Sequence, residues 1–311
     1  MRRRWRLKGL RLKFPSFGEL KSWRKTKKRF NFYLGILLFV LVFVVLGYAI
    51  LFTLHDFQSR KISIDEDKDE VKVKVEAEEE AKIAVLEEVP KARVAIILDD
   101  AGDDTIGLDD ALSIRSSLTI SILPGLPSSA LVARKVRDSG KEVMLHLPME
   151  PENGKYVRVD GSMILAEMQD SKIKEIVKNS LKDVPGAVGI NNHMGSKATQ
   201  VKRVMQAVLE VAKEKGLYFI DSRTSRTSIA YDVAKDMGLK CSENYIFLDV
   251  DTSSDVVEER LAELVTRAKR RGKAIGIGHI TRKTTLDILK RKMPEYEASG
   301  IKFVFASEVV K

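Results

Sequence analysis

The sequence has a single cysteine, Cys241, among 311 residues, so an internal disulfide framework is excluded. It also lacks the short motifs of several common enzyme classes. No Gly-x-Gly-x-x-Gly follows the first predicted strand, and no phosphate-binding loop with Gly-Lys-Ser/Thr occurs. There is no Gly-x-Ser-x-Gly nucleophile elbow. These absences argue against a dinucleotide-dependent enzyme, a P-loop nucleotidase and a serine hydrolase of the elbow type.

The folded part of the chain lacks an excess of basic residues. The net charge of +10 comes from 54 Lys and Arg against 44 Asp and Glu. Residues 1–29 hold 13 of the basic residues and one acid, Glu19, which leaves 41 basic and 43 acidic residues elsewhere. Four aromatic residues lie within this arm, so RNA binding is one interpretation. We favour a solvated arm beside anionic lipid headgroups, and no nucleic acid as partner.

Residues 32–54 contain no charged side chain. As a helix, 23 residues span about 34 Å, enough for a bilayer core of about 30 Å. The stretch is longer than a signal-peptide apolar region, and no small-residue cleavage site follows it. Basic residues precede it and acidic residues follow it, which orients it by the positive-inside rule. The sequence therefore predicts a single-pass helix in the inner (cytoplasmic) membrane, with residues 1–31 as a cytoplasmic arm and the C-terminal domain in the periplasm.

Residues 55–91 are acid-rich and nearly free of aromatic residues, which is typical of a linker. From residue 92 to residue 311, short apolar runs alternate with amphipathic stretches. Strands are predicted at 93–98, 118–123, 142–147, 187–191, 217–221, 245–249, 273–278 and 302–306. Helices are predicted at 127–139, 170–182, 199–215, 228–237, 254–271 and 282–292. The alternation favours an α/β domain with a parallel sheet closed as a barrel, and an open doubly wound sheet is the alternative.

Polar residues follow the predicted strands at their carboxyl ends, where α/β proteins keep their ligands. The first strand runs into the adjacent carboxylates Asp99 and Asp100. Neighbouring side chains of a strand point to opposite faces, so both could reach one site only if the strand ends before them. A helix-capping role for Asp100 is the alternative. Later strands are followed by His146 and Glu150, by Asn191, Asn192 and His193, by Asp221 and Arg223, and by His279.

All three histidines of the domain occupy this one structural position. Two or three imidazoles with one or two carboxylates form a site suited to zinc or a similar divalent ion. A metal with an open position can activate water for hydrolysis. A second carboxylate can then act as general base, and a remaining histidine can protonate the leaving group.

These residues resemble the divergent polysaccharide deacetylase family, a distant branch of the metal-dependent polysaccharide deacetylases. The resemblance covers residues from about 92 to 310. The matching motifs are Ile-Leu-Asp-Asp-Ala-Gly (97–102), Leu-His-Leu-Pro-Met-Glu-Pro (145–151), Gly-Ile-Asn-Asn-His-Met-Gly-Ser (189–196), Phe-Ile-Asp-Ser-Arg-Thr (219–224) and Gly-His-Ile (278–280). The resemblance implies a distorted (β/α) barrel of about seven parallel strands.

The resemblance also implies roles for the first two motifs. Asp99 matches the catalytic base of the better-known deacetylases, and Asp100 matches a metal ligand. Their second motif has two metal-binding histidines four residues apart. Here His146 matches the first, whereas Glu150 stands in place of the second. The third metal ligand is therefore either His193 or Glu150, and we take His193 as the prediction.

The last motif of those relatives supplies a catalytic histidine, which His279 matches. Asn192, Asp221 and Arg223, together with Glu150, are predicted to bind substrate or to support the site. The resemblance and the predicted membrane helix together indicate a membrane-anchored, metal-dependent hydrolase that acts on an N-acetylated or otherwise acylated polysaccharide of the cell envelope. Zinc is the divalent metal that we favour. The third motif of those relatives carries an arginine and an aromatic residue, whereas Asn191-Asn192-His193-Met194-Gly195 occupies that region here. Because the second and third motifs are thus altered, the alternative is a non-catalytic deacetylase-like protein that binds glycan or serves as an envelope scaffold.

Overall fold

The computed structural model describes residues 40–54, 92–103, 105–154 and 161–311, and it divides into two units, 1–83 and 84–311. In the first unit the described residues form one helix, 40–54, with exposed apolar side chains. No helix within the described ranges is long and apolar enough to cross a membrane. The first eight residues of the predicted span, 32–39, lie outside the described residues, as do the predicted arm and linker.

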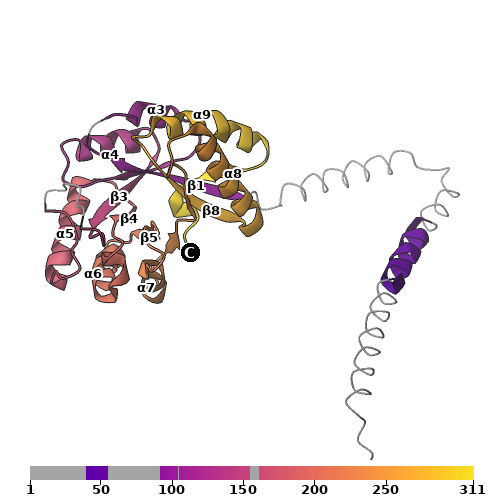
Figure 1. Ribbon diagram of the computed structural model, residues 1–311, viewed down its shortest axis with the longest axis horizontal. Helices are drawn as coiled ribbons and strands as arrows, with labels where there is room; N and C mark the ends of the chain where they lie inside the picture. The colour runs from indigo at the N-terminus through magenta and orange to yellow at the C-terminus, as the bar shows by residue number, and fades with distance from the viewer. Residues whose placement is uncertain (1–39, 55–91, 104, 155–160) are drawn as a thin grey trace, which may run out of the picture. The chain divides into compact units, whose positions relative to one another are not determined.

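The second unit alternates strands with helices as predicted (Figure 1). Its strands are β1 (Arg93–Ala101), β2 (Thr119–Ile122), β3 (Glu142–Met149), β4 (Gly189–Met194), β5 (Tyr218–Asp221), β6 (Cys241–Glu243), β7 (Ile246–Phe247), β8 (Lys273–His279) and β9 (Lys302–Val304). Its helices are α3 (Leu108–Ser113), α4 (Ser129–Asp138), α5 (Asp170–Asp183), α6 (Lys202–Glu214), α7 (Ala230–Asp236), α8 (Ser254–Arg271) and α9 (Lys283–Ala298), with 3-10 turns at Ala198–Gln200 and Ala306–Glu308.

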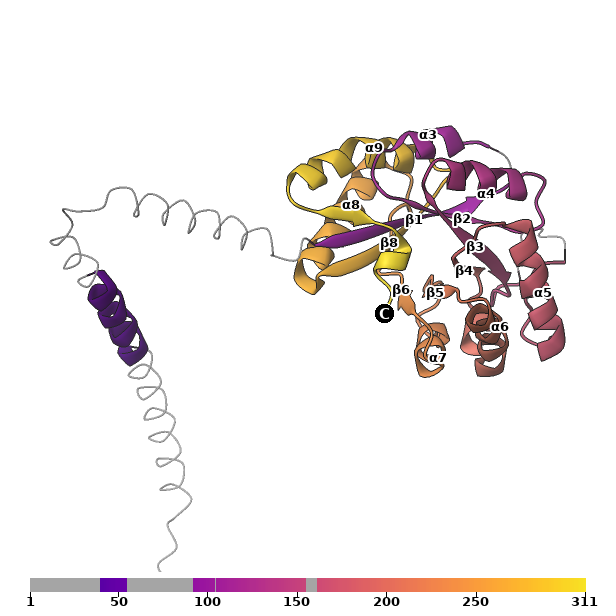
Figure 2. The ribbon, with the colours of Figure 1, turned by 180° about the vertical axis from the view of Figure 1, so that it is seen from behind.

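The strands form one parallel sheet that curls into a half-barrel. Their order is β6-β5-β4-β3-β2-β1-β8-β7, and β9 pairs with β1. The end strands β6 and β7 follow one another in the chain, but no pairing joins them among the described residues. Figures 1 and 2 show the helices arranged around the outside of the strands. This curled, incompletely closed sheet is consistent with the predicted distorted parallel barrel, and the described residues contain nine strands rather than about seven.

The central strand β1 is buried on both faces, as its unbroken apolar run predicts. Ile96 and Leu98 belong to the larger core cluster, which includes the residues of the covering helices. Ala95 and Ile97 belong to a smaller cluster with Ile277, and that cluster contains no residue of the α-helices. The helices therefore cover one face of the sheet, as in a barrel and unlike a doubly wound sheet.

The prediction that the first strand ends at Leu98 is wrong. β1 continues to Ala101, but its register against β2 shifts between Leu98 and Ala101. Asp100 has a left-handed backbone with φ 64° at this irregularity. A β-bulge re-aims side chains without ending the strand, and here it replaces the strand end that the sequence suggested.

Candidate active site

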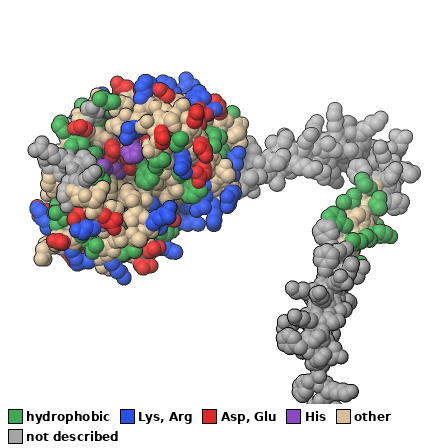
Figure 3. Space-filling view, viewed as in Figure 1, with side chains coloured by type: hydrophobic (Ala, Val, Ile, Leu, Met, Phe, Trp, Pro, Cys, Tyr) green, Lys and Arg blue, Asp and Glu red, His purple; other side chains and the backbone are tan. Residues whose placement is uncertain are grey.

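The carboxyl ends of β1, β3, β4 and β8 open into one cavity of about 660 Å³. Histidine side chains reach the surface of the domain in Figure 3. The cavity is lined by the five residues predicted to be catalytic or metal-binding: Asp99, Asp100, His146, His193 and His279. Parallel strands deliver these side chains to the same edge, although up to 180 positions of sequence separate them.

Asp100, His146 and His193 bring three potential ligand atoms together. Asp100 Oδ1 lies 3.2 Å from His146 Nε2 and 3.0 Å from His193 Nδ1. The two imidazole nitrogens are 3.1 Å apart. This is the one group of three such residues found among the described parts of the chain. It matches the predicted ligand set.

The spacing and chemistry of these atoms fit a divalent metal ion. Ligand atoms about 2.0–2.1 Å from a tetrahedral ion lie about 3.3 Å from one another, close to the three distances here. Asp100 Oδ1 is buried and has no hydrogen-bond partner in the described residues. A buried carboxylate oxygen facing two imidazole nitrogens is costly unless a cation satisfies all three. One carboxylate and two imidazoles suit zinc or a similar ion.

Asn191 holds the surrounding side chains in place. Its Oδ1 accepts hydrogen bonds from Ser121 Oγ (2.6 Å) and from His146 Nδ1 (2.8 Å), and its Nδ2 donates to Asp99 Oδ1 (2.9 Å). With its proton on Nδ1, His146 presents the lone pair of Nε2 to Asp100 and His193. Orientation of a ligating histidine through its other nitrogen is the usual arrangement at metal sites.

The bulge in β1 explains how two adjacent carboxylates reach one cavity. Asp100 adopts a left-handed conformation (φ 64°), which costs roughly 1–2 kcal/mol for a residue with a side chain. The carboxylate of Asp99 lies 3.6 Å from His146 Nε2 through its Oδ2. Burial raises the pKa of Asp99, against the opposing effects of His146 and Asn191. Asp99 is therefore placed as a proton acceptor beside the three ligand atoms.

His279 enters the cavity from the end of β8. Its Nδ1 lies 2.7 Å from Asp249 Oδ1, and its backbone N–H donates to Asp249 Oδ2 at 2.8 Å. Thr285 Oγ1 also donates to Asp249 Oδ2. The other ring nitrogen of His279, Nε2, lies 4.0 Å from Asp100 Oδ2 and so faces the candidate metal centre. Burial lowers the pKa of His279, but the Asp249 carboxylate outweighs this effect and raises it to about 9.

Glu150 is engaged elsewhere. Its Oε2 accepts a hydrogen bond from the backbone N–H of Ala166 (2.7 Å), and its Oε1 pairs with Lys197 Nζ (2.8 Å). Its backbone carbonyl accepts from the N–H groups of Lys197 and Ala198. Glu150 therefore joins the loops after β3 and β4, and the geometry favours His193 as the third ligand.

The three remaining predicted residues connect strand ends. Asn192 lines the cavity; its Oδ1 accepts from Ser222 N (2.9 Å), and its Nδ2 donates to the Met194 carbonyl (2.7 Å). Asp221 and Arg223 do not line it. Asp221 accepts hydrogen bonds from Ser228 Oγ and from the Arg223 N–H, while the Arg223 side chain pairs with Glu243. Both residues brace the chain after β5, and their neighbours Ser222 and Thr224 face the cavity instead.

Comparison with known proteins agrees with this geometry. A family model described as divergent polysaccharide deacetylase matches residues 96–310. The chain belongs to this family. The resemblance seen in the sequence is thereby confirmed.

Two relatives and one solved structure are similar to this deacetylase-family chain. It is 33% identical over 199 residues to the uncharacterized protein YibQ of Escherichia coli, a match that covers 64% of this chain and 62% of that protein. It is 29% identical over 208 residues to an uncharacterized protein of Haemophilus influenzae, covering 66% and 73% respectively. An uncharacterized protein of Agrobacterium tumefaciens shares the fold, with a TM-score of 0.67 at 21% identity, over 71% of this chain and 89% of that one.

Sequence reasoning assigned no role to Asn191 or to Asp249, both of which hold side chains of the site in this deacetylase-family domain. A signal existed for each. Asn191 and His193 are two residues apart on β4, so they share a face of the strand. Asp249 follows the apolar run 246–248 just as Asp99 follows its own.

Replacing Asp249 with asparagine should lower the pKa of His279 from about 9 toward its ordinary value of 6.5. The amide keeps the shape and an acceptor but removes the charge that favours the imidazolium. In the parent chain this ion pair stabilises the fold fully below pH 6.5, and the contribution is lost as pH rises through 9. Titration of the histidine ring protons by NMR in the full chain measures the shift, with His279→Gln assigning the resonance.

Asp251→Asn is the matched control, because Asp251 is exposed and its substitution removes the same charge two residues away from Asp249. An unchanged His279 titration in Asp249→Asn would show that the pair does not set the charge of this histidine.

Proposed function

We propose that this chain is a metal-dependent hydrolase that removes acetyl groups from an N-acetylated polysaccharide of the cell envelope. The observation that carries the proposal is the arrangement of Asp100, His146 and His193 around one point, with Asp99 and His279 in the same cavity. Family membership supports amide-bond hydrolysis on a polysaccharide. Zinc is the ion we propose, because the ligand set of one carboxylate and two imidazoles suits it.

The residues divide the work of hydrolysis as follows. A cation held by Asp100, His146 and His193 would act as a Lewis acid toward the acyl carbonyl and the attacking water. Asp99 takes the proton from that water as the carbon–oxygen bond forms. His279, protonated at neutral pH, gives its proton to the departing amine as the carbon–nitrogen bond breaks. The products are acetate and a free amine on the sugar.

Positioning residues keep both proton-transfer groups oriented. Asn191 holds Asp99 through a 2.9 Å hydrogen bond, and Asp249 holds His279 through bonds of 2.7 and 2.8 Å. Because these contacts are buried or partly buried, they cost little reorganisation when a substrate enters. The cavity of about 660 Å³ has room for a sugar unit carrying an acetamido group.

We also propose that residues 32–54 anchor the protein in the inner membrane, with the N-terminal arm in the cytoplasm and the catalytic domain in the periplasm. The uncharged 23-residue stretch and the 13 basic residues before it support this topology. It places the catalytic domain beside envelope polysaccharide. Protease added to spheroplasts should digest the catalytic domain and spare the arm, and protection of the domain would refute this orientation.

Acetate release tests the proposed activity. The full chain, purified in a neutral detergent and loaded with zinc, should release acetate and an equal amount of free amine from oligomers of N-acetylglucosamine or from glycan strands. Binding of the glycan without acetate release at any metal loading would instead support the non-catalytic alternative, a glycan-binding or scaffold protein.

A further inference from the structure

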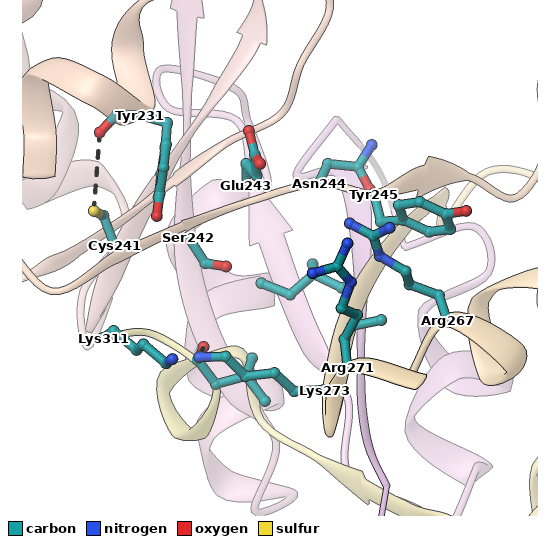
Figure 4. A pocket seen from close by; sticks show the side chains of 13 residues that line it. Tyr231, Cys241, Ser242, Glu243, Asn244, Tyr245, Arg267, Arg271, Lys273 and Lys311 are labelled. Atoms are coloured by element: carbon teal, nitrogen blue, oxygen red, sulfur yellow. Dashed lines mark hydrogen bonds between the residues drawn. The ribbon is translucent and has the colours of Figure 1, made fainter. Parts of the chain in front are cut away.

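A second cavity, of about 440 Å³, lies at the opposite ends of the strands from the candidate active site (Figure 4). Its wall includes Cys241 and Lys273, the first residues of β6 and β8, and Tyr245, which comes just before β7. The backbone of Lys311 pairs with that of Cys241 through bonds of 3.0 and 3.2 Å and fixes the last residue at the rim. The cavity thus lies at the amino end of the seam where the sheet does not close.

Four basic side chains share this cavity. Arg267 and Arg271 project from the last turns of α8, Lys273 begins β8, and Lys311 reaches in from the rim (Figure 4). Within the described ranges no carboxylate pairs with any of the four. Lys273 Nζ donates to the Val309 carbonyl, a neutral acceptor.

The wall has four basic side chains and one acidic side chain. Its one acidic residue, Glu243, is already paired with Arg223. The guanidinium of Arg267 lies over the ring of Tyr245, 4.4 Å from its centroid, which orients it without neutralising it. Arg260, on the same helix, pairs with Glu263 at i, i+3 spacing, so the lack of a carboxylate partner is confined to the residues of the cavity.

Like charges held this close are unfavourable. Arg267 and Arg271 are four residues apart on one helix face, a spacing at which equal charges destabilise a helix. Burial, and then the charges of Lys311 and Arg93, lower the pKa of Lys273. An anion in the cavity would offset the repulsion between these like charges.

We propose that this cavity binds a phosphate group, carried either by a phospholipid headgroup or by a free phosphate compound. Four cations exceed the charge of one carboxylate, so they can accommodate the single negative charge of a phosphate diester or the up to two negative charges of a phosphate monoester. The planar forks of two arginines suit the oxygens of phosphate. The hydroxyls of Ser242 and Tyr231, which also line the cavity, can donate to further oxygens.

The cavity is separate from the candidate active site in position and in lining residues. A ligand here would bind without occupying the place of the glycan. The proposal therefore stands or falls independently of the hydrolase activity.

Isothermal titration calorimetry of the full chain in neutral detergent tests the proposal. The probes are inorganic phosphate, glycerophosphoglycerol as the headgroup of an anionic lipid, and malonate as a dianion without phosphorus. Phosphate or glycerophosphoglycerol should bind the parent chain, and the double substitution Arg267→Gln with Arg271→Gln should weaken that binding on the order of 10- to 100-fold. The tighter of the two phosphate probes identifies the source.

The matched control is Lys269→Gln with Arg270→Gln, which removes the same charge from the same helix turns at exposed positions outside the cavity. It also corrects for binding to the basic N-terminal arm. Equal weakening in both double variants, no binding of either phosphate probe, or equally tight malonate binding overturns the proposal. If the glutamine variant loses helical circular dichroism, Arg267→Lys with Arg271→Lys keeps the charge and should still weaken binding through loss of the forks.

Discussion

Replacing Asp100 with alanine should leave the purified full chain without bound metal, where the parent chain carries about one divalent ion. The buried Oδ1 of Asp100 forms a triangle with His146 Nε2 and His193 Nδ1 whose sides are 3.0 to 3.2 Å, and Asp100 is the carboxylate of the one such group among the described residues. His146→Ala and His193→Ala should have the same effect. Loss of outer hydrogen bonds alone typically costs 10- to 100-fold in metal affinity, so loss of a ligand should cost more.

Metal analysis by inductively coupled plasma mass spectrometry gives the ion and its stoichiometry. Thermal unfolding gives a second measure, because an ion at about 100 times its dissociation constant stabilises the native state by about 2.7 kcal/mol. A chelator should therefore lower the melting temperature of the parent chain. It should not change that of Asp100→Ala.

Glu150→Gln is the control that separates the two candidates for the third ligand. Its oxygens are held by Lys197 and by the backbone N–H of Ala166, so this variant should keep its metal. Asn191→Ala should have a metal affinity between those of Glu150→Gln and the ligand variants. We expect a reduction of roughly 10- to 100-fold, because the hydrogen bond that orients His146 is lost. Full metal loss in Glu150→Gln with retention in His193→Ala would reverse our assignment.

Strand β1 shows how far sequence patterns reach into this fold. Unbroken apolar runs predicted most strands to within two or three residues, because a parallel strand buried on both faces has a nearly continuous apolar sequence. The bulge at Asp100 has no such signal. Its left-handed φ depends on how β1 pairs with β2, which is a tertiary contact between distant segments.

The sequence patterns also failed to predict two short elements, α3 and β6. Helix α3 has six residues and β6 has three, too few to show a period. α9 was predicted to end at residue 292, before Pro294, but it continues to Ala298. A proline near the end of a helix removes one backbone donor, and here Met293 and Tyr296, on either side of Pro294, pack against the core and offset that loss.

The candidate ligand set could be predicted except for one choice. Parallel strands bring their carboxyl ends to one edge, so the three histidines were expected together. From the sequence alone, Glu150 and His193 were both candidates for the third metal ligand. A strand advances about 3.3 Å per residue, and β3 runs on to Met149, so Glu150 lies roughly 13 Å along the chain from His146. His193, on the neighbouring strand, needs no such reach. Only the observed length of β3 decides between them.

Replacing Asp99 with asparagine should lower acetate release on the order of 10²- to 10⁴-fold, the usual contribution of a positioned general base. Asparagine keeps the shape, and its Oδ1 can still accept the hydrogen bond from Asn191 that Asp99 accepts at 2.9 Å. It cannot take a proton from water. The metal content should stay at the parent level, because Asp99 is not one of the three ligand residues. The fall should therefore appear in kcat and not in metal affinity.

Asp103→Asn is the matched control, since Asp103 is exposed on the loop after β1 and does not line the cavity. It should retain parent activity. Asp99→Asn with full metal and more than about a tenth of parent kcat would assign the base to another residue. Metal loss in Asp99→Asn would instead make Asp99 a ligand. If the two adjacent aspartates have separate roles, Asp100→Ala should lose the metal, whereas Asp99→Asn should keep the metal and lose kcat. Measuring metal content and kcat in both variants therefore tests the separation of roles that the bulge in β1 makes possible.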